Sequence, residues 1–167
     1  AIKDNSLIER TGRRIGAHCK ALGMQFNFAP DVDINTNPNN PIIGNRSFGE
    51  DKENVAQKGL AFTRGMQASG VLGSAKHFPG HGDSATDSHK TLPTIGFTAE
   101  RIGQVELYPF KMLKDEVASV MVAHLNVPSL EKKAGLPSSL SSAIITDLLK
   151  KQLGYEGLIF TDALGMK

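Results

Sequence analysis

Several features that would place a chain in a specialised class are scarce in this sequence. A single cysteine, Cys19, among 167 residues excludes an internal disulfide and a cysteine-based metal site. The sequence also has little excess of charge of either sign, with 19 Lys and Arg and 17 Asp and Glu. The basic residues are scattered, which excludes a basic surface for nucleic acid. The apolar runs are far shorter than the roughly 20 residues of a membrane helix. We therefore expect a soluble protein with no nucleic-acid or membrane partner.

What is present is the composition of an ordinary globular domain, with 40% hydrophobic and 22% charged residues. Residues 1–5 do not show the basic-then-apolar pattern of a signal peptide. Localisation stays open on this basis, since both the cytoplasm and export are compatible with the sequence.

Helical and strand patterns alternate along the chain. The predicted helices cover residues 5–22, 52–69, 99–116 and 141–153, and the predicted strands cover residues 24–29, 71–75, 119–123 and 157–161. Pro109 is expected to kink the third helix. Short, continuous apolar strands between helices are typical of an α/β fold in which helices cover a parallel sheet.

Two architectures of this class fit, a doubly wound open sheet and a (β/α)8 barrel of the TIM type. No phosphate-binding glycine fingerprint opens a predicted helix, which weakens the first. The second is favoured because polar side chains follow every predicted strand, as they do in barrel active sites. These are Asp31, Asp33, Lys76, His77, His124 and Asp162.

A complete barrel takes about 250 residues, whereas this sequence predicts only four strands. We expect residues 1–167 to form one partial barrel domain that lacks the first and last strands. A sheet that does not close leaves strand edges and apolar faces exposed. We therefore expect weak stability, or association with a second copy or with the missing parts of the barrel.

The segment 76–89 contains three histidines, and two of its residues form a candidate acid/base pair. Asp87 and His89 are two residues apart, so in an extended segment their side chains project to the same side. A carboxylate beside an imidazole fixes its tautomer and raises its pKa toward neutrality, as a group that gives and then takes a proton requires. The alternative is a hydrogen bond that only stabilises the loop.

Other candidates lie at the ends of the strands and in a rigid loop. Asp162 follows the last strand, either as a reactive carboxylate or as a helix N-cap. Lys76, His77 and Arg46 offer donors toward hydroxyl oxygens, although Arg46 could instead pair with a neighbouring acid, Glu50 or Asp51. His124 lines the site or satisfies backbone groups.

The same residue types could also bind a metal ion. The set would be His77, His81, Asp87, His89, His124 and Asp162. Their spacing matches neither His-x-x-x-His on a helix nor a zincin motif. We therefore expect a site without metal or cofactor.

Four segments resemble, in order, the bacterial β-N-acetylglucosaminidases of glycoside hydrolase family 3. They are NFAPDVD (27–33), NRSFG (45–49), KHFPGHG (76–82) with DSH (87–89), and FTD (160–162). The resemblance spans essentially the whole chain. It implies a barrel that removes terminal, non-reducing N-acetylglucosamine from β-linked substrates such as peptidoglycan fragments, with retention of configuration.

The resemblance also implies roles for individual residues. Asp162 matches the nucleophile, His89 the general acid/base and Asp87 its dyad partner, while Arg46, Lys76 and His77 match sugar-binding positions. A neutral His89 would place no second negative charge beside the glycosyl-enzyme, and its loop is expected to close over the sugar. A phosphorylase, a metal-dependent hydrolase and a non-catalytic sugar-binding module are the alternatives.

Overall fold

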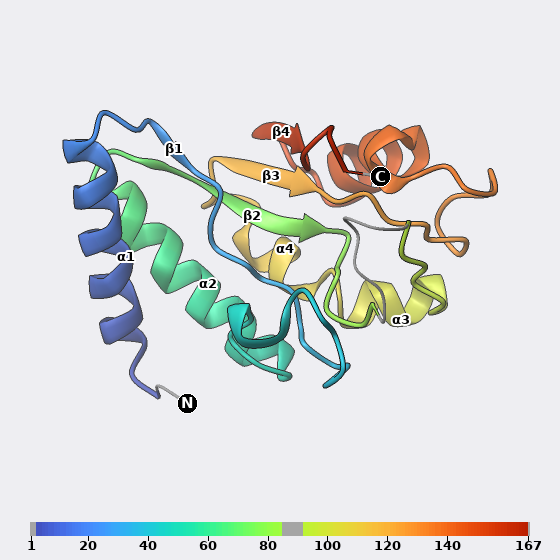
Figure 1. Ribbon diagram of the computed structural model, residues 1–167, viewed down its shortest axis with the longest axis horizontal. Helices are drawn as coiled ribbons and strands as arrows, with labels where there is room; N and C mark the ends of the chain where they lie inside the picture. The colour runs from blue at the N-terminus through green and yellow to red at the C-terminus, as the bar shows by residue number, and fades with distance from the viewer. Residues whose placement is uncertain (1–2, 85–91, 167) are drawn as a thin grey trace.

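The computed structural model describes residues 3–84 and 92–166 and shows an α/β fold with one parallel sheet (Figure 1). Its strands are β1 (Phe26–Asn27), β2 (Leu72–Phe78), β3 (Ser119–Val122) and β4 (Leu158–Thr161), in the order β1-β2-β3-β4. All three neighbouring pairs are parallel, which confirms the predicted fold class. β1 and β4 are the edges of the described sheet, which is open.

Helices connect and cover the strands. They are α1 (Asn5–Ala21), α2 (Lys52–Gln67), α3 (Ala99–Gln104), α4 (Tyr108–Leu113), the π-helix η3 (Ala143–Gln152), and the 3-10 turns η1 (Gly44–Arg46) and η2 (Ser138–Leu140). α2 packs on α1, on β2 and on α4 (Figure 1). Close approach of α1 and α2 requires glycine, because a Cβ on Gly65 would lie 1.9 Å from the carbonyl oxygen of Glu9. None of the helices in the described residues is long and apolar enough to cross a membrane.

Three boundaries differ from the predicted ones. The predicted helix 99–116 is two helices, α3 and α4, with Pro109 in the first turn of α4, where its missing N–H breaks no helical hydrogen bond. The predicted strand 24–29 has only two regular residues, but pairing with β2 continues irregularly as far as Asp31. β2 runs to Phe78, so Lys76 and His77 lie inside the strand rather than after it.

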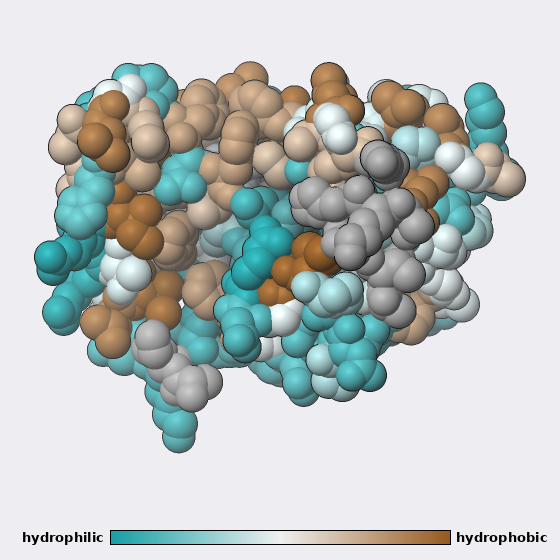
Figure 2. Space-filling view, in the orientation of Figure 1, coloured by the Kyte–Doolittle hydropathy of each residue, from teal (hydrophilic) through white to brown (hydrophobic). Residues whose placement is uncertain are grey.

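The core lies between the helices and one face of β2 and β3. Phe78 of β2 is fully buried and meets the ring of Phe110 edge-to-face, with 5.2 Å between centroids. Phe160 of β4 meets the rings of Phe26 in β1 and of Phe28 edge-to-face. Apolar side chains are visible along the side of the molecule where β1 and β4 lie (Figure 2), and Leu158 and Phe28 are about half exposed there.

Candidate active site

The carboxyl ends of the strands surround a cavity of about 320 Å³. Its lining brings together four of the predicted site residues, Arg46, Lys76, His77 and Asp162. The parallel arrangement explains this, because the carboxyl ends of all four strands reach the same edge of the sheet. The other two predicted residues, Asp87 and His89, lie outside the described residues.

Asp162 directly follows β4 and is half-buried. Its backbone N–H donates to the carbonyl oxygen of Val122 at 2.9 Å, which ties this position to β3. Its carboxylate accepts a hydrogen bond from the amide of the next residue, Ala163, at 2.8 Å. Residues 164–165 form a turn, and the alternative helix N-cap interpretation of Asp162 stays a prediction.

Lys76 and His77 both line the cavity although they are neighbours in β2. The register between β2 and β3 shifts between Ala75 and Phe78, so the regular alternation of side chains is interrupted here. Burial, and next the positive charge of Arg46, lower the pKa of the Lys76 ammonium. The cations Arg46 and Lys76 and the imidazole of His77 thus lie together in the lining of the cavity.

Arg46 ends the 3-10 turn η1 and reaches across to residues of two other segments. Its Nη2 lies 3.4 Å from Oδ2 of Asp31 and 3.4 Å from Nε2 of His77. The alternative pairing with Glu50 or Asp51 is wrong, because the ion pair of Arg46 is with Asp31, and Asp51 instead caps α2 by accepting the amide of Asn54.

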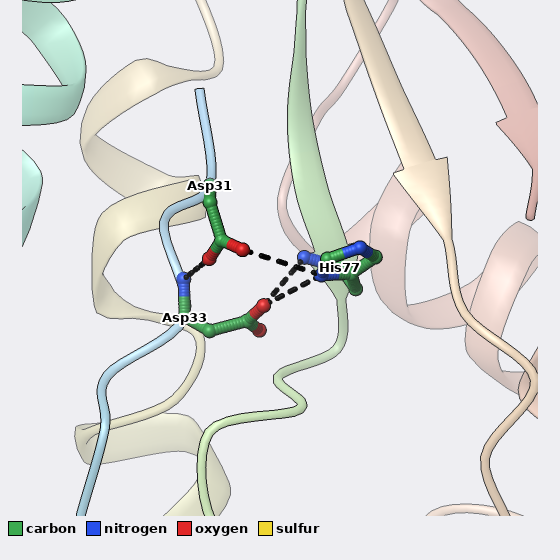
Figure 3. A group of neighbouring side chains, drawn as sticks. All are labelled: Asp31, Asp33 and His77. Carbon is green, nitrogen blue, oxygen red and sulfur yellow. Dashed lines mark hydrogen bonds and ion pairs between the residues drawn. The ribbon is translucent and has the colours of Figure 1, made fainter. Parts of the chain in front are cut away.

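The carboxylate of Asp33 is completely buried against His77 (Figure 3). Its Oδ2 lies 2.7 Å from the ring Nδ1 of His77 and 3.2 Å from the backbone N of the same residue. Its Oδ1 accepts the backbone N–H of His81 at 2.6 Å. Burial alone would raise the pKa of Asp33, but the charge and hydrogen bond of His77 and the contacts with His81 lower it to about 2.

Asp31 is the second buried carboxylate, and its surroundings act in the opposite direction. Its Oδ1 accepts the N–H of Asp33 at 3.2 Å, while its Oδ2 is 4.0 Å from Nδ1 of His77 (Figure 3). Burial first, and then the charge of Asp33, raise the pKa of Asp31 to about 7. Two carboxylates two residues apart are therefore shifted in opposite directions.

Within residues 3–84 and 92–166, the group with donor atoms close enough to hold a cation is Asp31, Asp33 and His77, whose atoms lie within 4.8 Å of one another. Nδ1 of His77 is already hydrogen-bonded to Asp33, so a cation at this atom would have to replace that bond. The set shares only His77 with the metal site that the sequence suggested.

His124 follows β3 and supports the chain next to Asp162. Its Nε2 lies 3.1 Å from the carbonyl oxygen of Ala163, and its Nδ1 lies 2.6 Å from Oγ of Ser139. A carbonyl can only accept, so Nε2 carries the proton and Ser139 donates to Nδ1 when the ring is neutral. Of the two predicted roles, satisfying the backbone is therefore the one that the contacts confirm.

Sequence reasoning assigned no role to Asp33 or to the backbone of His81. The available signal was the Asp-x-Asp spacing directly after a strand, at the edge of the sheet where active sites form. Its partner His77 is 44 residues away in sequence, a distance over which spacing carries no information about contact.

Residues 1–167 match the glycosyl hydrolase family 3 N terminal domain. A solved glycoside hydrolase family 3 β-N-acetylglucosaminidase from Paenibacillus sp. str. FPU-7 is 46% identical, with a TM-score of 0.95, over 98% of this chain and 31% of that chain. Beta-hexosaminidase A of Pseudoalteromonas piscicida is 42% identical over 91% of this chain and 27% of its own length.

The structure of the β-glucoside phosphorylase BglX is 30% identical, with a TM-score of 0.94, over 98% of this chain and 31% of that chain. The chain thus spans less than a third of each of these three relatives. The match covers every segment that forms the cavity and the sheet. The chain therefore belongs to glycosyl hydrolase family 3.

Proposed function

We propose that this chain supplies the nucleophile and several sugar-binding groups of a retaining β-N-acetylglucosaminidase. The substrates would be glycosides with a terminal, non-reducing, β-linked N-acetylglucosamine, peptidoglycan fragments among them. The observation that carries the proposal is that the Asp162 carboxylate shares one cavity with the cationic donors of Arg46 and Lys76 and with the ring of His77. The β-N-acetylglucosaminidase and β-hexosaminidase relatives support this substrate class.

In the first step a carboxylate oxygen of Asp162 attacks the anomeric carbon, and the bond from that carbon to the leaving oxygen breaks. His89, paired with Asp87, gives its proton to the leaving oxygen. In the second step water attacks the anomeric carbon, passes a proton back to His89, and the ester bond to Asp162 breaks. Two inversions give net retention.

The cavity wall fits a hydroxyl-rich ring. Lys76 and Arg46 have only donors, and their hydrogen bonds to hydroxyl oxygens are strengthened by charge. The charges of Lys76 and Asp162 also attract each other across the cavity. These groups would hold the sugar so that its anomeric carbon lies against Asp162, and positioning of this kind accounts for a large share of enzymatic rate enhancement.

We also propose that residues 1–167 form part of a (β/α)8 barrel whose remaining strands come from elsewhere in the protein. Support comes from a four-stranded parallel sheet with two open edges and from relatives about three times as long. Association of the 167-residue chain with itself stays a prediction. Size-exclusion chromatography with light scattering over a concentration series tests it, and a monomer at all concentrations would contradict it.

The stereochemistry of the product and the role of His89 test the mechanism in the full-length protein. Proton NMR during the first turnovers should show the β-anomer of N-acetylglucosamine, whereas first appearance of the α-anomer would contradict a glycosyl-Asp162 intermediate. His89→Ala should lose about 10²- to 10⁴-fold in kcat, and less on a substrate whose leaving group needs no proton. An equal loss on both substrates would exclude His89 as the acid.

Phosphorolysis is a second candidate, favoured by the likeness to the β-glucoside phosphorylase. Phosphate would replace water in the second step and release a sugar 1-phosphate. Comparing product identity in phosphate and in phosphate-free buffer separates the two reactions. A metal-dependent hydrolase would instead lose activity to a chelator, and a binding module would bind N-acetylglucosamine without turnover.

A further inference from the structure

We propose that Asp33 is a positioning residue for sugar recognition. Its buried carboxylate fixes the tautomer of His77, so that Nε2 faces the cavity as a hydrogen-bond acceptor. The tautomer itself follows from the contacts of the described residues. Only the identity of the group that meets Nε2 rests on the proposed function.

The contacts of the Asp33 carboxylate fix which nitrogen of His77 carries the proton. An ionised carboxylate has acceptors and no donor, so every group bonded to it must bring a proton. The backbone amides of His77 and His81 do so, and Nδ1 of His77 at 2.7 Å must do so as well. Asp33 has no exposed side-chain surface, so water does not compete for these bonds.

The other ring nitrogen of His77, Nε2, is then left without a proton. When Nδ1 of a neutral imidazole carries the proton, Nε2 has a lone pair and can only accept. Nε2 of His77 lies 3.4 Å from Nη2 of Arg46, a group that can only donate, so the two are complementary. The cavity then presents an acceptor beside the donors of Lys76 and Arg46.

An acceptor beside cationic donors favours a hydroxyl group as the ligand. A sugar hydroxyl is both a donor and an acceptor. One hydroxyl can donate to Nε2 of His77, in place of the 3.4 Å contact from Arg46, while it accepts from Lys76 or Arg46. With Nε2 protonated, the same wall would present donors alone, and a hydroxyl would lose one of its two bonds. A site built to bond a hydroxyl discriminates strongly against an analogue that lacks it.

Asp33 also joins three segments of the wall. Its carboxylate binds the end of β2 and the loop that follows, and its carbonyl oxygen accepts the hydroxyl of Ser47 at 2.6 Å, next to Arg46. Its loss would therefore disturb packing as well as the tautomer. The test must separate these two effects.

Asp31→Asn is the matched control for Asp33→Asn. Both substitutions remove one buried carboxylate charge from the same segment, yet Asp31 lies 4.0 Å from Nδ1 of His77, too far for a hydrogen bond. In Asp33→Asn the side-chain oxygen can keep the short bond to the His81 amide. In that orientation its amide N–H points at Nδ1 of His77 and forces the proton onto Nε2, while the backbone N–H of His77 loses its acceptor at 3.2 Å.

Long-range ¹H–¹⁵N correlation spectra of ¹⁵N-histidine-labelled protein measure the tautomer of a neutral imidazole directly. The five histidines are assigned with single His→Gln variants. We expect Nδ1–H with unprotonated Nε2 in the wild type and in Asp31→Asn, and Nε2–H in Asp33→Asn. The wild-type spectrum alone decides the proposal if Asp33→Asn does not fold, because Nε2–H there would overturn it.

Titration with N-acetylglucosamine and its monodeoxy analogues tests recognition without turnover. In the wild type, one analogue should bind about tenfold more weakly than the parent sugar, and in Asp33→Asn that difference should shrink to about twofold. An unchanged pattern, or an unchanged tautomer in folded Asp33→Asn, would overturn the proposal. Failure of the glycosidase assays with the expected tautomer would overturn only the proposed function.

Discussion

The two sides of the cavity are held in different ways. On one side, Asp33 and His77 are buried and bonded to each other, and Asp33 also holds the loop at His81. On the other side, Asp162 is half-buried, and within the described residues its carboxylate is hydrogen-bonded only to the amide of Ala163. The buried side can fix geometry because its groups have no freedom to move. The Asp162 carboxylate on the β4 side has fewer contacts, so in the proposed mechanism positioning and bond formation fall to groups of different burial.

The largest effect is expected on the β4 side, and on activity alone. Asp162→Asn should abolish turnover, because an amide cannot form the glycosyl ester. The free energy of unfolding should change by no more than about 0.5 kcal/mol, as for other substitutions outside the core. Steady-state kinetics and urea denaturation check both parts. A variant that turns over at near wild-type rate, or one that unfolds, would break the comparison.

On the buried side, substitution of Asp33 should lower the free energy of unfolding. Asp33→Ala leaves N–H groups of His77 and His81 without their buried acceptor, and removing one partner of a buried charged pair destabilises by about 3–5 kcal/mol. Urea denaturation at pH 7 measures the loss, with Asp162→Ala as the matched control. Equal stability of the two variants would show that the buried contacts do not hold the fold together.

Asp31, on the buried side, makes the free energy of unfolding depend on pH. Its pKa is raised from 3.8 to about 7 in the folded protein, first by burial and then by Asp33. The folded state therefore keeps a proton that the unfolded state releases, and the free energy of unfolding falls as pH rises through this window.

Asp31→Asn should remove that fall and gain up to about 4 kcal/mol over the wild type between pH 4 and pH 8. Denaturation at several pH values measures it, with Asp162→Asn as a control that removes a half-buried carboxylate. A wild-type and an Asp31→Asn profile of the same slope would contradict the account.

The smallest effect is expected at His124, which contacts the chain next to Asp162. Ser139→Ala removes the hydroxyl that bonds Nδ1 of His124, whose other nitrogen holds the carbonyl oxygen of Ala163. We expect a loss of about 1 kcal/mol in the free energy of unfolding and less than a tenfold loss in kcat. A larger loss in kcat than in stability would mean that this contact orients Asp162 directly.

The fold class and the gathering of four site residues could be predicted from the sequence for one reason. Continuous apolar strands between helices predict a parallel sheet, and parallel strands bring their carboxyl ends to one edge. Lys76, His77 and Asp162 therefore meet although they come from two strands. Arg46 joins them from a loop rich in glycine and asparagine.

What could not be predicted depends on contacts between distant residues. The pairing of Asp33 with His77 spans 44 residues, and that of Arg46 with Asp31 depends on the path of a loop. The extent of β2 was missed because polar Lys76 and His77 interrupt the apolar run, although their backbones continue the strand. The sequence predicts a single helix kinked at Pro109, whereas this proline lies in the first turn of a second helix, α4.

The account depends most on a covalent bond between substrate and the last strand. Full-length protein incubated with a 2-fluoro glycosyl fluoride should accumulate a stable ester, because the fluorine at C2 slows hydrolysis of the ester more than it prevents its formation. Peptide mass spectrometry should find the added sugar mass on the peptide that contains Asp162, and none in Asp162→Asn. An adduct on any other residue, or no adduct in an enzyme that turns over the parent glycoside, would contradict the account.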